Sequence, residues 1–173
     1  MVLIKAVLAT TLLAALISIG GFTALAGDFG SFFRGPPVFG ASLNGYQEVP
    51  TIYSNGTGTF NARLISNGTI LTYELSYKNL TSVTTAYIGF GEPGIAGGVI
   101  AYLCGGGGLP ACPASPGSIS GNITSANVLG IAGQGVSAGN FPALVAALRN
   151  GALFLNVGTK AFTSGEIRGQ IGG

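Results

Sequence analysis

The sequence predicts an all-β fold, an antiparallel Greek-key β-sandwich of about eight strands with one short helix. Short segments that alternate apolar and polar residues occur along most of the chain, which is the pattern of half-buried strands. Turn signals separate these segments, and the 31 glycines of the chain supply many of them. One segment alone, near residue 145, has the spacing of a helix. The expected strands are 41–49, 57–65, 69–77, 83–90, 98–104, 117–124, 152–158 and 165–171.

The clearest strand is 69–77. Alternation places Leu71, Tyr73, Leu75 and Tyr77 on one face and polar side chains on the other. Asn67-Gly68 precedes it and is a tight-turn signal. The pattern therefore predicts a hairpin that joins 57–65 to 69–77.

The helix is expected after Asn140, which is suited to capping its N-terminus, and Pro142 lies in its first turn. Asn150-Gly151 ends it. Its apolar stripe, formed by Leu144, Val145 and Leu148, is expected to lie across an edge of the sheets.

The N-terminus predicts export. Lys5, an apolar run from residue 6 to 19 and Ala24-Leu25-Ala26 have the order of a secretory signal peptide that is cleaved after Ala26. The apolar run is short for a membrane span of about 20 residues, so we expect no stable membrane anchor after cleavage. The mature chain then has an arm, 27–40, rich in Phe, Gly and Pro, followed by one domain, 41–173.

The low content of charged residues limits which classes of function fit this chain. Charged residues make up 7% of the chain, and the formal net charge is +2 with no basic cluster. Nothing in this pattern indicates nucleic-acid binding. A protein surface with so few charges is expected to be covered by sugar or by another protein, which predicts a protein partner or self-association.

Two features suit an extracellular protein. Cys104 and Cys112, the only cysteines, predict a structural disulfide in an exported chain, and no further ligands are present for a metal site. Four N-x-T sequons are candidates for glycosylation: Asn55, Asn67, Asn79 and Asn122. The alternative is that Asn-Gly-Thr segments are simply turns.

Several motifs resemble one family when they are taken in order. The chain contains Leu43-Asn44-Gly45-Tyr46-Gln47-Glu48-Val49-Pro50 near the start of the domain, and it ends with Gly165-Glu166-Ile167-Arg168-Gly169-Gln170-Ile171 after Leu153-Phe154-Leu155-Asn156-Val157. In this order the segments resemble the CHRD domain, a secreted module first described in an extracellular antagonist of bone morphogenetic proteins. The resemblance spans about residues 41–171 and implies a β-sandwich that acts as an extracellular interaction module.

The chain departs from this family at its histidines. Members usually carry A-H-I-H-x-G and N-V-H-T, whereas this chain has Tyr87, Gly89 and Gly158 at the matching positions and no histidine at all. Two histidines two residues apart on a strand would point to one face and could share a metal ion. We therefore expect no metal or other cofactor in this chain.

Glu166 and Arg168 are also two residues apart on a strand and so share a face. They form either an exposed pair of little energetic weight or a buried or interface pair that Glu48 joins. A carboxylate pair of a hydrolase, Glu48 with Glu166, is the weakest reading, because nothing else in the sequence supports it.

The sequence favours a non-enzymatic module that binds at the cell surface. The alternative is a structural subunit of an extracellular filament or surface layer. In that case an arm with Phe29, Phe32, Phe33, Val38 and Phe39 would be inserted as a strand into a neighbouring molecule.

Overall fold

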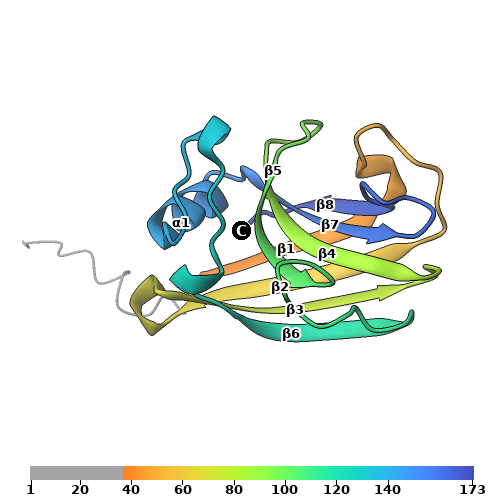
Figure 1. Cartoon of the computed structure of the whole chain (residues 1–173), viewed down its shortest axis with the longest axis horizontal. Coiled ribbons are helices and arrows are strands. Elements are labelled where there is room, and N and C mark those ends of the chain that lie inside the picture. Colours follow the sequence, from red (N-terminus) through yellow and green to blue (C-terminus); the bar gives the residue numbers. More distant parts are fainter. Residues whose placement is uncertain (1–36) are drawn as a thin grey trace, which may run out of the picture. The chain divides into compact units, whose positions relative to one another are not determined.

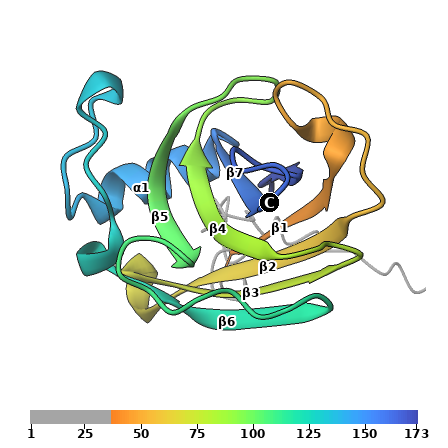
Figure 2. The same cartoon turned by 45° about the vertical axis from the view of Figure 1, so that its right-hand side comes forward.

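The computed structural model describes residues 37–173. Eight antiparallel strands form one continuous sheet in the order β5-β4-β7-β8-β1-β2-β3-β6, and the sheet curls until it is nearly closed (Figures 1 and 2). The strands are β1 (Val38–Asn44), β2 (Thr57–Ile65), β3 (Ile70–Lys78), β4 (Val83–Phe90), β5 (Gly98–Cys104), β6 (Gly117–Ile123), β7 (Leu153–Thr159) and β8 (Ile167–Gln170). The prediction of an all-β antiparallel fold with one short helix is confirmed.

The strand boundaries follow the sequence pattern closely. The bounds of β2, β4 and β5 are those expected, and β3, β6, β7 and β8 differ at their ends. The largest shift is at β1, which begins at Val38 and ends at Asn44. Val38 and Phe39, which we expected in the arm, therefore belong to the sheet, where Phe39 pairs with Ala62 and is buried. Residues 27–36 of the arm and the expected signal peptide lie outside the described residues.

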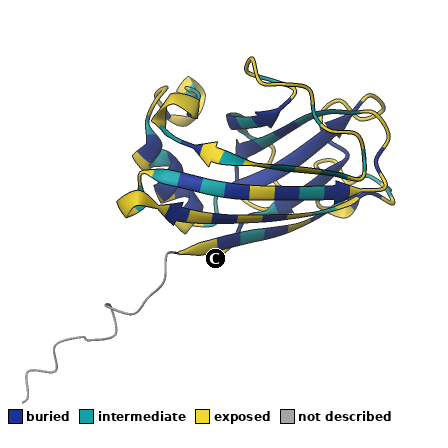
Figure 3. Cartoon of the chain, turned by 90° about the horizontal axis from the view of Figure 1, so that it is seen from below, coloured by how far each residue is buried: buried dark blue, intermediate teal, exposed yellow. Residues whose placement is uncertain are grey.

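The core fills the inside of the curled sheet. Leu71, Tyr73, Leu75 and Tyr77 of β3 are all buried, as the alternation predicts, and exposed or half-buried polar residues lie between them. The same alternation occurs along β2. Figure 3 shows it as bands of buried and exposed residues along the strands. Asn67, at φ 56°, and Gly68 form the turn that joins the two strands.

The helix α1 (Phe141–Arg149) lies at one end of the sheet (Figure 1). The side chain of Asn140 accepts a hydrogen bond of 3.1 Å from the Ala143 amide, which confirms it as the N-cap. Leu144 and Leu148 are buried in the core, so the apolar face of the helix closes this end of the barrel. Short 3-10 turns occupy Gly45–Gln47, Ser66–Gly68, Ser125–Asn127 and Ala132–Gln134.

β7 differs from the other strands because all its residues are buried. Both faces of this strand are therefore covered. Antiparallel sheets more commonly have one face on the core and the other in water. Leu153, Leu155 and Val157 belong to the core. The outer face, with Phe154 and Asn156, is covered by loops, and the polar site described next lies beneath them.

Candidate functional site

A row of paired residues crosses the outer face of four neighbouring strands. Tyr87 of β4 pairs with Asn156 of β7, Asn156 pairs with Arg168 of β8, and Arg168 pairs with Asn44 of β1. Directly paired residues in an antiparallel sheet point to the same face. Their side chains therefore form one row on the face opposite the core.

The loop 45–56 lies over this row and carries Glu48 into it. Glu48 is 6% exposed, and its Oε2 accepts a hydrogen bond of 3.2 Å from Asn156 Nδ2. The close approach depends on Gly165, which has a φ of +150°. A Cβ at this glycine would overlap both the Asn156 amide and the Glu48 carboxyl.

Glu166 connects the same loop to the end of β7. Its Oε1 accepts a hydrogen bond of 2.7 Å from Ser54 Oγ, and its Oε2 accepts one of 2.7 Å from Thr159 Oγ1. Glu166 is 9% exposed and Thr159 is fully buried. Both carboxylate oxygens therefore serve to hold the loop and the strand end together.

Arg168 is the central charge of the site and is 2% exposed. Its Nη2 donates hydrogen bonds to the carbonyl oxygens of Glu92, at 3.1 Å, and Ile95, at 2.8 Å, which fixes the loop 91–97 over the face. Burial lowers the pKa of Arg168, and the charge of Glu48 opposes this effect.

The three charged residues predicted as one cluster do lie buried on this face. They are not joined by direct contacts, however, because within residues 37–173 no carboxylate oxygen lies within 4.0 Å of the Arg168 guanidinium. Asn156 contacts Glu48, and Glu166 has its own hydroxyl partners. The attraction between Glu48 and Arg168 therefore acts across a longer distance, without an ion-pair contact.

The positions that match the family's histidines lie together on the same face. Tyr87 pairs with Asn156, Gly89 pairs with Phe154, and Thr85 pairs with Gly158 across β4 and β7. A Cβ at Gly89 would overlap the outer end of the Phe154 ring. The aromatic ring thus occupies the place that a side chain at residue 89 would take.

Tyr87 is held in this face as a neutral phenol. Its hydroxyl donates a hydrogen bond of 3.3 Å to the Ser164 carbonyl oxygen, and its ring meets that of Phe154 edge-on at 6.4 Å. Burial, followed by the nearby charge of Glu48, raises the pKa of Tyr87. This environment disfavours the phenolate that a metal ion would require.

Several oxygens beneath the loops have no hydrogen-bond partner. They are Asn44 Oδ1, Glu48 Oε1, Asn156 Oδ1 and Gln170 Oε1. Burial raises the pKa of Glu48 to about 7, and the charge of Arg168 partly opposes this shift. Glu48 Oε1 and Asn156 Oδ1 both lie 2.5 Å from the position of a Cβ on Gly165, so they are near one another. A proton on Glu48 would supply a donor to this group of acceptors.

A cavity of about 320 Å³ opens beside this cluster. One wall is formed by the loop from Tyr46 to Thr51, another by Pro93 and Gly94, and β8 contributes Arg168 and Gln170. It therefore lies where two of the covering loops meet the charged row.

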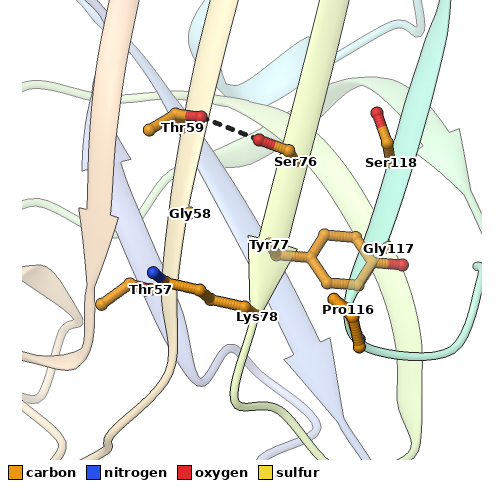
Figure 4. A pocket seen from close by; sticks show the side chains of 9 residues that line it. All are labelled: Thr57, Gly58, Thr59, Ser76, Tyr77, Lys78, Pro116, Gly117 and Ser118. Atoms are coloured by element: carbon orange, nitrogen blue, oxygen red, sulfur yellow. Dashed lines mark hydrogen bonds between the residues drawn. The ribbon is translucent and has the colours of Figure 1, made fainter.

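A second hollow, of about 640 Å³, lies over β2, β3 and β6 (Figure 4). Thr59 and Ser76 are joined there by a hydrogen bond of 2.8 Å, and Lys78 is the one charged residue that lines it. It contains none of the residues of the buried cluster.

The other predicted sites have clear positions. Cys104, at the end of β5, and Cys112 form a disulfide with Cα atoms 5.0 Å apart. The four sequon asparagines, Asn55, Asn67, Asn79 and Asn122, are all exposed. In the expected arm, Val38 is 52% exposed, whereas Phe39 is buried and Phe29, Phe32 and Phe33 lie outside the described residues.

Sequence reasoning missed Phe154, Asn156, Ser54 and Thr159 as parts of the site. For Phe154 and Asn156 a signal was available, because the alternation of β7 places both on the face of the matched histidine position, Gly158. Ser54 and Thr159 are ordinary loop and strand residues in the sequence, and only the folded chain brings them to Glu166.

Among the described residues, no group of three or more His, Cys, Asp or Glu side chains is placed to hold a metal ion. No helix within residues 37–173 is long and apolar enough to cross a membrane.

The fold and the site define a small all-β module whose polar cluster lies under loops on one outer face of the sheet. Residues 39–171 match the family model of the CHRD domain, so the chain belongs to the CHRD domain family. No curated protein and no solved structure matches the chain.

Proposed function

We propose that this protein is a non-enzymatic, secreted module that binds a partner at the cell surface. One observation carries the proposal. Among residues 37–173, five of the eight exposed large apolar side chains belong to three loops over the outer face of β7 and β8, namely 45–56, 91–97 and 160–166: Tyr46, Val49, Tyr53, Ile95 and Phe162. Exposed aromatic and apolar side chains gathered in one region are typical of interaction surfaces.

The three loops are attached to the same face by separate contacts. Ser54 of the first loop bonds to Glu166, the carbonyl of Ile95 in the second accepts from Arg168, and the carbonyl of Ser164 in the third accepts from Tyr87. The buried cluster thus holds the loops in position. A rigid loop surface loses little conformational entropy when it binds, which favours recognition.

The buried carboxylates support binding over catalysis. Glu48 and Glu166, the residues of the hydrolase alternative, are 6% and 9% exposed, and both oxygens of Glu166 already accept hydrogen bonds from hydroxyl groups. General acid or base catalysis needs a carboxyl within hydrogen-bond reach of the substrate. The arrangement gives these groups a structural role instead.

The disulfide and the four exposed sequons support an extracellular location. The proposal includes cleavage after Ala26, so intact-mass measurement of the exported protein should show Gly27 as its first residue.

Binding of fluorescently labelled, secreted protein to the cells that produce it tests the function. We expect saturable binding that the double variant Tyr53→Ala/Phe162→Ala weakens by about tenfold or more. The matched control is Ile65→Ala/Leu109→Ala, which removes two similarly exposed apolar side chains outside the three loops. Absence of saturable binding, or equal weakening by both double variants, would contradict the proposal.

A second candidate function is a subunit of an extracellular filament or surface layer. It is favoured by the sheet order, in which β6 is a terminal strand and pairs only with β3 among the described residues. A terminal strand has backbone groups that can pair with a strand from another molecule. Negative-stain electron microscopy of the secreted protein separates the two candidates, because filaments are expected only for the second.

A further inference from the structure

The cavity between the loop 46–51 and residues 93–94 contains a charged group with unused hydrogen-bonding capacity. Arg168 borders the cavity and is 2% exposed, and it has no carboxylate within 4.0 Å among residues 37–173. Both of its hydrogen bonds come from Nη2, so Nε and Nη1 have no protein acceptor among those residues. A buried cation with free donors beside a cavity indicates a ligand that supplies acceptor atoms.

The geometry of Arg168 argues against a carboxylate as that ligand. A guanidinium grips a carboxylate with two parallel N–H groups, and each such pair includes an N–H of Nη2. Both hydrogens of Nη2 are already donated, to the carbonyls of Glu92 and Ile95. The remaining N–H groups can donate only single bonds, which suit hydroxyl oxygens, and Glu48 in the cavity wall would repel an anion when it is ionised.

The Arg168 donors are the open polar groups of the cavity. The Gln170 amide nitrogen donates to the carbonyls of Gly91, at 2.9 Å, and Gly151, at 2.7 Å. Gln170 Oε1 and Glu48 Oε1 have no partner among the described residues but are buried away from solvent, so a ligand in the cavity does not reach them. The ligand is therefore one that supplies single acceptor oxygens to Arg168, and hydroxyl groups do so.

The rim is apolar and aromatic. Tyr46 lines the cavity and is 65% exposed, and Val49, Pro50 and Pro93 line it as well. The flat face of a tyrosine ring packs against aliphatic C–H groups, while its hydroxyl remains in water. The volume of about 320 Å³ lies at the small end of the range found for ligand sites, so the cavity suits one ring rather than an extended chain.

We propose that this cavity binds a neutral sugar ring, the terminal unit of a glycan at the cell surface. Arg168 donates to its hydroxyl oxygens, and Tyr46 packs on its C–H face. This proposal rests on the proposed function, because it names the class of partner that the binding module recognises.

Saturation-transfer NMR with the complete secreted protein tests it. The probes are methyl glycosides of neutral hexoses and of N-acetylhexosamine, together with methyl hexuronosides as the carboxylate comparison. We expect at least one neutral glycoside to bind and to shift the Arg168 Nε–H resonance, with the corresponding hexuronoside weaker. No binding by any neutral glycoside at millimolar concentration, or tighter binding of the hexuronoside, would overturn the proposal.

A matched pair of variants localises the site. Tyr46→Ala should weaken binding by about fivefold, the change expected for loss of one aromatic contact. Leu109→Ala is the control, because Leu109 is 38% exposed, lies outside the three loops and does not line the cavity. Both positions are exposed, so both variants should fold, which thermal unfolding checks. Equal affinity of the two variants would place the sugar elsewhere and overturn the assignment.

The two proposals fail in different ways. If cells bind the protein but no neutral glycoside does, the cavity assignment fails and the binding module stands. If cells do not bind the protein in a saturable manner, the proposed function fails, whatever the glycosides show.

Discussion

The guanidinium of Arg168 lies directly over the ring of Phe154, with 3.7 Å between Arg168 Cζ and the ring centroid. The same ring fills the space that a side chain at Gly89 would need. Phe154 thus provides a favourable contact for a buried cation and also fills the space beside Gly89, one of the three positions singled out in the sequence. Packing and hydrogen bonds around Arg168 thus hold this outer face together.

Replacing Phe154 by alanine should strongly destabilise the protein. The ring is 2% exposed, so its removal leaves a cavity and takes the aromatic face away from Arg168. We expect a loss of about 3–5 kcal/mol in the free energy of unfolding, measured by urea denaturation. Phe162→Ala is the control, because Phe162 is 37% exposed, and a change of similar size there would argue against this role of Phe154.

A methyl group at Gly89 should be costly because of this ring. Gly89→Ala places a Cβ where it overlaps the outer end of the Phe154 ring, and we expect a loss of about 1–3 kcal/mol in the free energy of unfolding. In a Phe154→Ala background the same substitution should cost much less, since the space is then free. Gly133→Ala is the matched control, because a Cβ there meets nothing within 4 Å. Additive effects of Gly89→Ala and Phe154→Ala in a double-mutant cycle would show that the two residues do not compete for this space.

Glu48 should make the protein less stable as the pH rises. Its pKa is raised from 4.5 to about 7 in the folded protein, mainly by burial. The folded state therefore holds the proton more tightly than the unfolded state does. This contribution to stability is complete below about pH 4.5, falls as the pH approaches 7 and is constant above it.

The variant Glu48→Gln isolates this effect. The fall amounts to at most about 3 kcal/mol between these limits. We expect Glu48→Gln to flatten the difference in unfolding free energy between pH 5 and pH 8, whereas Glu74→Gln, at an exposed position of β3, should keep it. A Glu48→Gln protein whose stability still falls as steeply as that of the wild type would show that another group is responsible.

The sequence predicts the strands well because their pattern is local. The alternation of 69–77 and the Asn67-Gly68 turn identify β3 and its hairpin without reference to the rest of the chain. β1 is the instructive exception. The expected domain began at Ala41, where the family resemblance starts, but pairing of Val38 with Arg63 and burial of Phe39 extend the strand toward the N-terminus.

The sequence predicts only part of the site, because the site combines segments that are far apart along the chain. The spacing of Glu166 and Arg168 indicates that they share a face, and both are indeed buried there. That Arg168 bonds to carbonyls of residues 92 and 95, and that Ser54 bonds to Glu166, depends on the paths of two loops. Loop paths have no periodic signal in a sequence.

The disulfide should contribute to stability without being essential to the fold. Cys104 and Cys112 are 8 residues apart in the sequence and close the loop that follows β5. A loop of this length is worth about 2–3 kcal/mol by the chain-entropy estimate. We expect the Cys104→Ala/Cys112→Ala protein to lose about that amount in urea unfolding and to keep its far-ultraviolet circular dichroism. Alkylation and intact-mass measurement of the unreduced, secreted wild type should show no free thiol, and two labelled thiols would contradict the bond.

Two N-terminal truncations should behave differently. A chain that begins at Pro37 keeps all of β1 and the hydrogen bond of 3.3 Å from the Leu64 amide to the Pro37 carbonyl, so it should fold with a stability close to that of the mature protein. A chain that begins at Gly40 loses Phe39, which is 5% exposed and pairs with Ala62. We expect this second truncation to cost about 3–5 kcal/mol in urea unfolding, as removal of a buried phenylalanine does.

The first truncation also tests the filament alternative. It removes Phe29, Phe32 and Phe33 while it leaves the sheet complete, so any loss of assembly is separate from a loss of folding. If the secreted protein forms filaments and the chain that begins at Pro37 is a folded monomer by sedimentation, residues 27–36 carry the contact between subunits. If both chains are monomeric, strand donation by this segment is excluded and the binding module remains. Equal stability of the two truncated chains would contradict the placement of Phe39 in the core.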